Sequence, residues 1–283
     1  MAVKLADLHT HTTASDGLQR PADNVRMAKA AGLAAIGISD HDTVDGIEEA
    51  MNEGERLGIS VVPGVEISTF AEGCDIHILG YYTDWRSDRW QDKLRTLLNG
   101  RNRRNELILE KLDKLGIPIT MPEVLAEARR TGKDGGTIGR PHIAAVLLAR
   151  GVVGSMQEAF DIYLGSGGKA YASAPRLSPF EALEWIREAG GTSVIAHPGI
   201  YGNDDLVQAI VRAGAEGIEV YHSDHTLTDE LKYGELARQH GLIVTGGSDF
   251  HGVREGEDVF HGPIGYRTVD AAVLKQLNPA WRI

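Results

Sequence analysis

Histidine and aspartate residues recur along this chain in short clusters, and most of the clusters follow a short apolar run. The first is D-L-H-T-H-T-T-A-S-D-G, in which His9 and His11 are one residue apart and Asp16 follows. Side chains at positions i and i+2 of a strand point the same way, so two imidazoles can reach one ion. Asp249 and His251 would do the same if their strand stays extended. A single such pair is better explained as chance, but its repetition at strand ends favours a metal site.

A second cluster, I-S-D-H-D, combines a turn with possible ligands. Asp42 or Thr43 is expected to cap a helix that begins near Val44. Asp40 and His41 then remain available for chemistry.

Three further candidates lie in apolar runs. Glu66 ends V-V-P-G-V-E, where a carboxylate would be costly to bury without a partner, and a metal ion would remove that cost. His77 in D-I-H-I-L-G and His197 in S-V-I-A-H-P could each, taken alone, be a core histidine with satisfied hydrogen bonds. Together the clusters supply nitrogen and oxygen ligands, which suit zinc, manganese or iron and not an all-oxygen calcium site.

The chain alternates between helix-like runs that end at a glycine and short apolar runs that end at a polar cluster. The glycines are Gly32, Gly58, Gly191, Gly214 and Gly241. Glycine suits the left-handed position just past a helix, and a short β-branched run suits a strand buried on both faces. This alternation predicts an α/β fold with a parallel sheet or barrel, in which the polar clusters gather at the carboxyl ends of the strands.

Residues 97–168 break the alternation, because the helical runs in this segment lead to no acidic or histidine cluster at a strand end. The series resumes near Ser178, where S-P-F-E has the pattern of a capped helix start. We therefore expect a barrel domain of residues 1–96 and 169–283. A mostly helical insertion, residues 97–168, is expected to cover one face of the barrel as a cap.

The composition excludes several classes of function. The chain has 283 residues and a formal net charge of −11. This negative charge argues against a protein that binds duplex nucleic acid through a basic face. No apolar run is long enough to cross a membrane, and the N-terminus lacks the apolar core of a signal peptide. The chain has one cysteine, Cys74, so it cannot form an internal disulfide, and Cys74 is expected to be structural. We therefore predict a cytoplasmic protein. No obligate protein partner is evident.

The ordered motifs D-L-H-T-H, I-S-D-H-D, G-V-E, I-H-I-L-G, I-A-H-P and G-S-D-F-H resemble those of the polymerase and histidinol phosphatase (PHP) superfamily. The resemblance covers nearly the whole chain. It is especially close to the stand-alone phosphoesterases, which include nucleoside 3′,5′-bisphosphate phosphatases and a 5′-to-3′ exoribonuclease. It implies a distorted (β/α)7 TIM-like barrel with a helical insertion and a centre of three divalent ions, manganese, iron or zinc.

The resemblance also implies which residues hold each ion. The first set is His9, His11, Glu66 and Asp249. The second shares Glu66 and adds His77 and His197. The third is Asp16, His41 and His251. The residues expected to be catalytic are Asp16, Glu66, His197 and Asp249. Asp40 is expected to lie behind the ligands and orient a histidine.

The activity implied by the resemblance is hydrolysis of a phosphate ester by metal-activated hydroxide, without a covalent protein nucleophile. The expected substrate is a nucleoside 3′,5′-bisphosphate, attacked at its 3′-phosphate. Trimming of short RNA from the 5′ end and hydrolysis of a histidinol-phosphate-type ester are alternatives. A non-catalytic PHP module that stabilises a polymerase is a different class, and the presence of every expected ligand argues against it.

Several residues outside the metal set are candidates for substrate binding. The insertion contains G-R-P-H, in which Arg140 and His142 match an R-x-H element that contacts substrate phosphate in the family. The alternative is that they are a surface arginine and a histidine at a helix start, without a role in binding. Lys169 adds charge at the edge of the insertion. His222 and His225 are equally compatible with lining the pocket and with a structural role. The histidines expected to be structural or solvated are His240 and His261.

Overall fold

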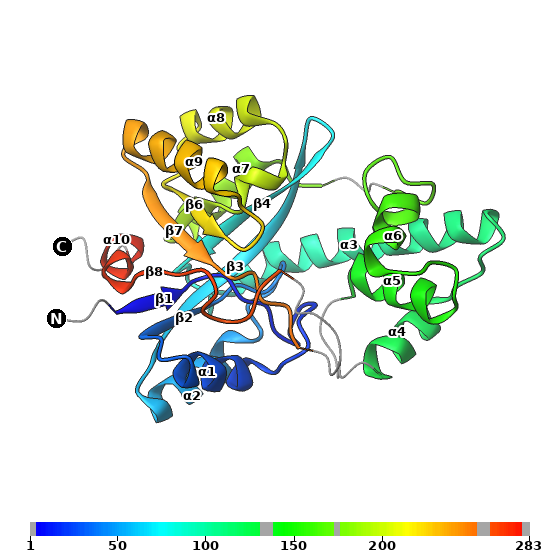
Figure 1. Ribbon diagram of the computed structural model, residues 1–283, viewed down its shortest axis with the longest axis horizontal. Helices are drawn as coiled ribbons and strands as arrows, with labels where there is room; N and C mark the ends of the chain where they lie inside the picture. Colours follow the sequence, from blue (N-terminus) through cyan, green and yellow to red (C-terminus); the bar gives the residue numbers. More distant parts are fainter. Residues whose placement is uncertain (1–3, 131–137, 173–175, 254–260, 279–283) are drawn as a thin grey trace.

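The computed structural model of the protein describes residues 4–130, 138–172, 176–253 and 261–278. Its strands form one sheet in the order β7-β6-β5-β4-β3-β2-β1-β8 (Figure 1). The strands are β1 (Leu5–Asp7), β2 (Ala35–Ile38), β3 (Ser60–Ala71), β4 (Cys74–Tyr81), β5 (Thr192–Ile195), β6 (Gly217–His222), β7 (Ile243–Gly247) and β8 (Val269–Asp270).

Helices cover the outside of this sheet, with α1 and α2 on one side and α7, α8 and α9 on the other (Figure 1). The helices are α1 (Pro21–Ala30), α2 (Ile47–Leu57), α3 (Asp88–Lys114), α4 (Met121–Arg130), α5 (Arg140–Ala149), α6 (Met156–Ala159), α7 (Pro179–Glu188), α8 (Asp204–Arg212), α9 (Leu227–His240) and α10 (Leu274–Leu277). Shorter helical turns are η1 (Phe160–Leu164), η2 (Pro198–Ile200) and η3 (Ala271–Val273).

The two ends of the sheet approach each other, so the sheet forms a nearly closed barrel. Leu8 N donates to the carbonyl oxygen of Gly246 at 3.1 Å, and Asp249 N donates to that of His9 at 2.9 Å. These bonds join the chain after β1 to β7 and the residues that follow it. The predicted α/β barrel is confirmed, and its closure brings the first polar cluster beside the last one.

The sheet is not parallel throughout, because β4 runs antiparallel to both β3 and β5. Glu72 and Gly73 join β3 to β4 and have φ angles of 51° and 84°. A two-residue hairpin turn of this kind needs positive φ at both positions, which a glycine adopts readily. The hairpin departs from the expected parallel arrangement, and His77 consequently enters the site from within a strand.

The predicted helix start at Ser178 is confirmed. The Ser178 hydroxyl accepts a hydrogen bond from Glu181 N, and the Glu181 carboxylate accepts one from Ser178 N at 2.9 Å. This reciprocal capping box satisfies two backbone donors that the first turn of α7 leaves open.

The predicted cap at Asp42 or Thr43 is wrong. Helix α2 begins at Ile47, three residues after the expected start at Val44. The Asp42 carboxylate instead accepts hydrogen bonds from the Arg101 guanidinium of α3, the shorter at 2.7 Å. A buried arginine therefore competes successfully for the side chain that could have capped the helix.

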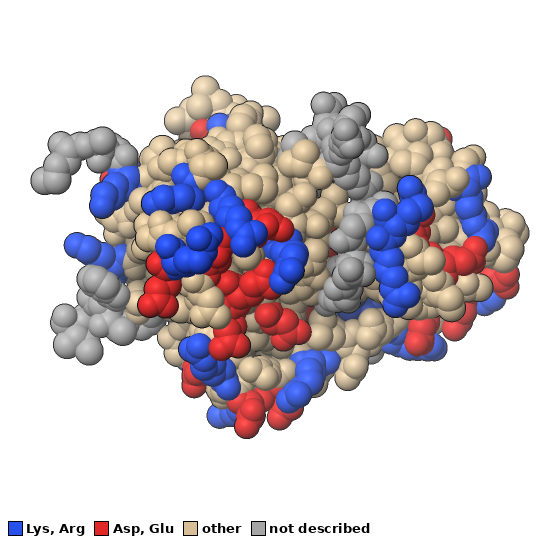
Figure 2. Space-filling view, turned by 90° about the horizontal axis from the view of Figure 1, so that it is seen from below, with Lys and Arg blue, Asp and Glu red and all other residues tan. Residues whose placement is uncertain are grey.

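The outer face formed by α1 and α2 carries charges of both signs (Figure 2). Arg20 pairs with Glu49 at 3.2 Å, and Arg26 and Arg56 both pair with Glu53. This face is therefore not a basic patch of the kind that attracts duplex phosphates.

Helices α3 to α6, with η1, form a hydrophobic cluster of their own beside the barrel (Figure 1). Its fully buried residues include Ile108, Leu112, Val124, Ile143 and Leu147. The first turns of α3 belong to the barrel, since Trp90 and Leu94 pack in the barrel core. Helix α3 thus links the two parts, and the insertion boundary expected at residue 97 falls inside it and stays a prediction.

Candidate metal centre

The barrel encloses a cluster of buried acidic and histidine side chains. It contains all the residues predicted as metal ligands, which are His9, His11, Asp16, His41, Glu66, His77, His197, Asp249 and His251. They come from segments far apart in the sequence and meet because the barrel closes.

Glu66 of β3 lies at the centre of the cluster and is 1% exposed. Its Oε1 is 2.8 Å from His77 Nδ1 and 3.0 Å from His197 Nε2. Its Oε2 is 2.9 Å from His41 Nδ1 and 3.2 Å from His11 Nε2. One carboxylate therefore lies within 3.2 Å of four imidazole nitrogens, an arrangement that suits a ligand shared between ions.

His9 and His11 point toward each other, with their Nε2 atoms 3.2 Å apart. Asp249 Oδ1 completes this group at 3.0 Å from His11 Nε2 and 3.4 Å from His9 Nε2. The expected i, i+2 spacing thus places both imidazoles on one side of the chain, as the sequence predicts.

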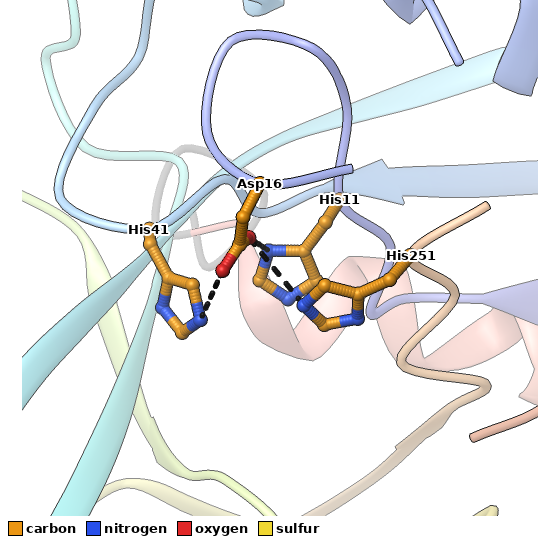
Figure 3. A group of neighbouring side chains, drawn as sticks. All are labelled: His11, Asp16, His41 and His251. Carbon is orange, nitrogen blue, oxygen red and sulfur yellow. Dashed lines mark ion pairs between the residues drawn. The ribbon is translucent and has the colours of Figure 1, made fainter. Parts of the chain in front are cut away.

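Asp16 gathers a third group, in which its carboxylate lies among His11, His41 and His251 (Figure 3). Asp16 Oδ1 is 3.4 Å from His251 Nε2, and Asp16 Oδ2 is 3.8 Å from His41 Nε2. Asp249 has a φ of 53°, so the chain does not stay extended between it and His251. The turn directs the His251 ring toward Asp16, while the Asp249 carboxylate faces His9 and His11.

Several buried atoms in this cluster make no hydrogen bond within the described residues. They are Asp16 Oδ1, His41 Nδ1, Glu66 Oε2, His77 Nδ1, His197 Nδ1 and Asp249 Oδ1. Buried polar atoms are normally paired, and buried nitrogen and oxygen atoms that point at one another without a hydrogen bond are suited to bind a metal ion. The residues present therefore fit divalent metal ions.

The charges in the cluster point the same way. Burial acts to raise the pKa of Glu66, but His77 and His41 hold that pKa well below its ordinary value. Burial acts to lower the pKa of His11, but Asp249 and Glu66 raise it to about 10. The carboxylates stay ionised and favour positive charge in a buried site, and a divalent cation would supply that charge in place of the imidazole proton.

Glu219 of β6 is a buried member of the site that the sequence analysis missed. Its Oε1 is 3.1 Å from His9 Nδ1, and its Oε2 accepts a hydrogen bond from His197 N at 2.9 Å. A carboxylate behind an imidazole sets which ring nitrogen faces the metal. The signal was available, because Glu219 lies in the apolar run G-I-E-V-Y just as Glu66 lies in its own.

His261, which was expected to be structural or solvated, also lies against a candidate ligand. Its Nδ1 is 2.5 Å from Asp224 Oδ2, and its Nε2 is 3.4 Å from Asp249 Oδ2. No sequence motif marks His261, which reaches the site only through the fold of the C-terminal segment. His240 ends α9 and is exposed, as expected.

Asp40 lies behind the ligands and acts mainly on the loop that carries Asp16. Its carboxylate accepts hydrogen bonds from Thr12 N at 2.8 Å and from Ser15 Oγ at 2.5 Å. Ser15 Oγ in turn is 3.4 Å from His11 Nδ1. The predicted orienting effect on a histidine would pass through Ser15, and it stays a prediction.

The predicted substrate contacts of the insertion have partners inside the protein. Arg140, at the start of α5, donates to Asp75 Oδ2 at 3.0 Å. His142 Nδ1 accepts a hydrogen bond from the backbone N–H of Gly139, the residue just before the same helix. Lys169 is exposed and lies 5.9 Å from the ring centroid of Tyr163. Their roles toward a substrate stay predictions.

The two histidines after β6 differ. His222 is buried, and its Nε2 is 3.3 Å from Asp249 Oδ2, so it lies against the candidate metal ligands. His225 Nδ1 is 2.8 Å from the Val220 carbonyl oxygen, and its Nε2 accepts a hydrogen bond from Gly199 N at 3.0 Å. Both ring nitrogens of His225 are engaged within the chain, which favours its structural alternative.

Comparison with known proteins agrees with this geometry. The model of the PHP domain matches residues 7–162, more than half of the chain. The chain belongs to the PHP family. Its relatives include the 5′-3′ exoribonuclease Rnm of Escherichia coli, 35% identical over 252 residues that cover 87% of this chain and 84% of the relative.

A second PHP relative is the 3′,5′-nucleoside bisphosphate phosphatase of Chromobacterium violaceum, 34% identical over 90% of each chain. A crystal structure from Bifidobacterium adolescentis, assigned to the metal-dependent phosphoesterases, superimposes with a TM-score of 0.84 at 31% identity. It covers 96% of this chain and 94% of that one. This PHP protein is therefore a metal-dependent phosphoesterase, a hydrolase of phosphoric esters.

Proposed function

We propose that this phosphoesterase removes the 3′-phosphate of a nucleoside 3′,5′-bisphosphate, such as adenosine 3′,5′-bisphosphate. The observation that carries the proposal is the buried Glu66 carboxylate within 3.2 Å of four imidazoles, which supports a centre for several divalent ions. The C. violaceum relative named for this substrate matches the chain over 90% of its length.

Three divalent ions, manganese, iron or zinc, would be held by three sets of residues. The sets are His9, His11, Glu66 and Asp249; Glu66, His77 and His197; and Asp16, His41 and His251. When bound, such ions lower the pKa of a water molecule and neutralise charge on a phosphoryl group. The four residues proposed to be catalytic, Asp16, Glu66, His197 and Asp249, contribute as ligands and not as nucleophiles.

Two buried carboxylates outside this set hold parts of it in place. Glu219 fixes the His9 ring and the His197 backbone, and Asp40 fixes the loop before Asp16. Rigid ligands of this kind avoid reorganisation during the reaction, which is where electrostatic catalysis gains most.

The partner of the site is a small phosphorylated nucleotide or a short oligonucleotide. We keep Arg140, His142, Lys169 and His222 as proposed contacts to it and leave out His225. Within the ranges that the structure describes, no helix has the length and apolar character needed to cross a membrane. A cytoplasmic location and the absence of an obligate protein partner stay predictions.

The substrate is tested with purified protein and manganese. Inorganic phosphate should be released faster from adenosine 3′,5′-bisphosphate than from adenosine 5′-monophosphate, which lacks the 3′-phosphate. Equal rates would contradict the substrate assignment, and histidinol phosphate is compared in the same assay.

A second candidate is removal of nucleotides from the 5′ end of short RNA, favoured by the 35% identity to the E. coli exoribonuclease. The same centre could hydrolyse a phosphodiester. Short RNA labelled at its 3′ end should shorten stepwise if this activity exists. A non-catalytic module would bind fewer than two ions after manganese or iron supplementation, which metal analysis measures directly.

A further inference from the structure

A pocket lined by arginines lies where α3 meets the barrel. It encloses about 250 Å³, and its wall includes Arg101 and Arg104 of α3, Arg176, and Ser68 of β3. Trp185 of α7 contributes an apolar side. None of these residues is among the predicted metal ligands or substrate contacts.

The arginines around this pocket outnumber their carboxylate partners. Arg101 pairs with Asp42 at 2.7 Å. Arg140 and Arg176 share one carboxylate, that of Asp75. Arg104 has no acidic partner among the residues that the structure describes, so the group carries more positive than negative charge.

Arg104 is 5% exposed, and its Nε makes no hydrogen bond to any described residue. Its one side-chain hydrogen bond within the described part of the chain is long, 3.5 Å from Nη2 to Asn105 Oδ1. Burial, together with the charges of Arg101 and Arg140, lowers the pKa of Arg104 well below its ordinary value. A buried guanidinium without a counter-charge is unfavourable, and an anion in the pocket would relieve it. The Nε of Arg176 is likewise buried without a hydrogen bond.

The pocket is next to the candidate metal centre. Ser68 follows Glu66 by two residues on β3 and is paired in register with His77 of β4. Two residues of extended strand span about 7 Å. Asp42 lies on the same wall of the pocket and directly follows His41 in the sequence. Its Oδ1 accepts a hydrogen bond from Ser68 N at 2.8 Å.

We propose that this pocket binds a second phosphate group of the substrate, the one that is not hydrolysed, with Arg104 as its direct ligand. The planar guanidinium matches phosphate oxygens in a two-pronged contact, and Arg176 and Arg101 add charge on either side. The proposal rests on the proposed function, in which a nucleotide with two phosphates occupies the site. It explains how such a substrate is told apart from one with a single phosphate.

Binding and turnover test it separately. Adenosine 5′-monophosphate retains only the phosphate assigned to the pocket, so its binding is measured by calorimetry on the manganese-loaded protein. Arg104→Gln should weaken this binding about 10- to 100-fold, as expected for loss of a charged hydrogen bond. Arg103→Gln is the matched control, since Arg103 is the next residue on α3 and its side chain is 56% exposed.

A second pair of variants guards against misfolding of Arg104→Gln. Thr96 is exposed at the rim of the pocket, so Thr96→Glu should fold and place a repelling carboxylate there. Asn99→Glu adds the same charge at an exposed position of α3 outside the pocket. Weakened binding by Thr96→Glu but not by Asn99→Glu is the expected result.

The ratio of kcat/KM for adenosine 3′,5′-bisphosphate over adenosine 3′-monophosphate should fall at least about tenfold in Arg104→Gln. An unchanged ratio, or equal binding of adenosine 5′-monophosphate by wild type, Arg104→Gln and Thr96→Glu, would overturn the pocket assignment. If the bisphosphate is not hydrolysed but adenosine 5′-monophosphate binds in an Arg104-dependent way, the proposed substrate fails and the phosphate pocket stands.

Discussion

Glu219 Oε1 lies 3.1 Å from Nδ1 of His9, and neither side chain is exposed to solvent. The contact joins residues that are 210 positions apart and leaves His9 Nε2 facing His11 and Asp249. A carboxylate in this position orients the imidazole and makes it a better ligand.

Glu219→Gln should therefore lower kcat about 10- to 100-fold and weaken metal binding by a similar factor. The amide keeps the shape but loses the charge that fixes the His9 ring. Kinetics and metal titration of the purified variant measure both. Glu235→Gln, an exposed change on α9, is the control, and wild-type values for Glu219→Gln would show that the contact has no role in the site.

Glu66→Gln should reduce turnover more than ~100-fold, because it removes a carboxylate that lies within 3.2 Å of four imidazoles. The number of ions bound per chain should fall as well. Metal analysis after manganese loading measures this, with Glu72→Gln in the β3–β4 turn as the control. An active variant with the full number of ions would refute the assignment of Glu66 as a ligand.

Removal of metal should lower the free energy of unfolding. The buried nitrogen and oxygen atoms of the cluster make no hydrogen bond within the described residues, so they would lose the ion that satisfies them. Ligands that bind only the folded state stabilise it by about 2.7 kcal/mol at a hundred times Kd. The free energy of unfolding, measured in urea after chelation and again after manganese is restored, should rise by an amount of this order. The rise should be smaller in Glu66→Gln; an equal rise in both proteins would locate the stabilising ion elsewhere.

Asp75 should make stability depend on pH in acid. Burial acts to raise its pKa, but Arg140 and Arg176 lower the pKa from 3.8 to about 2. A lowered pKa stabilises the fold above the unfolded value of 3.8, and this contribution, about 2 kcal/mol, is lost as the pH falls toward 2.

Asp75→Asn should accordingly be less stable than wild type at pH 7, and the difference should shrink between pH 4 and pH 2. Urea unfolding at pH 7, 4 and 3 measures the difference. Asp92→Asn, at an exposed site on α3, is the control. A difference that does not change with pH would mean that packing, and not the charge of Asp75, is what the variant removes.

Local features of this protein were predictable from sequence because neighbouring residues decide them. The capping box at Ser178 involves residues three apart, and the common direction of His9 and His11 follows from the two-residue period of an extended chain. The order of the motifs was enough to assign the family and the set of candidate ligands. Local reasoning failed at Asp42, where a distant arginine took the side chain from the helix start.

The tertiary structure alone decided which of these side chains meet. Barrel closure brings Glu219 behind His9, and the fold of the C-terminal segment brings His261 to Asp249. The fold also places Arg104 of α3 in a buried position without an acidic partner among the described residues. Such contacts depend on how strands separated by many residues pair and close, and no local period or cap in the sequence encodes that pairing.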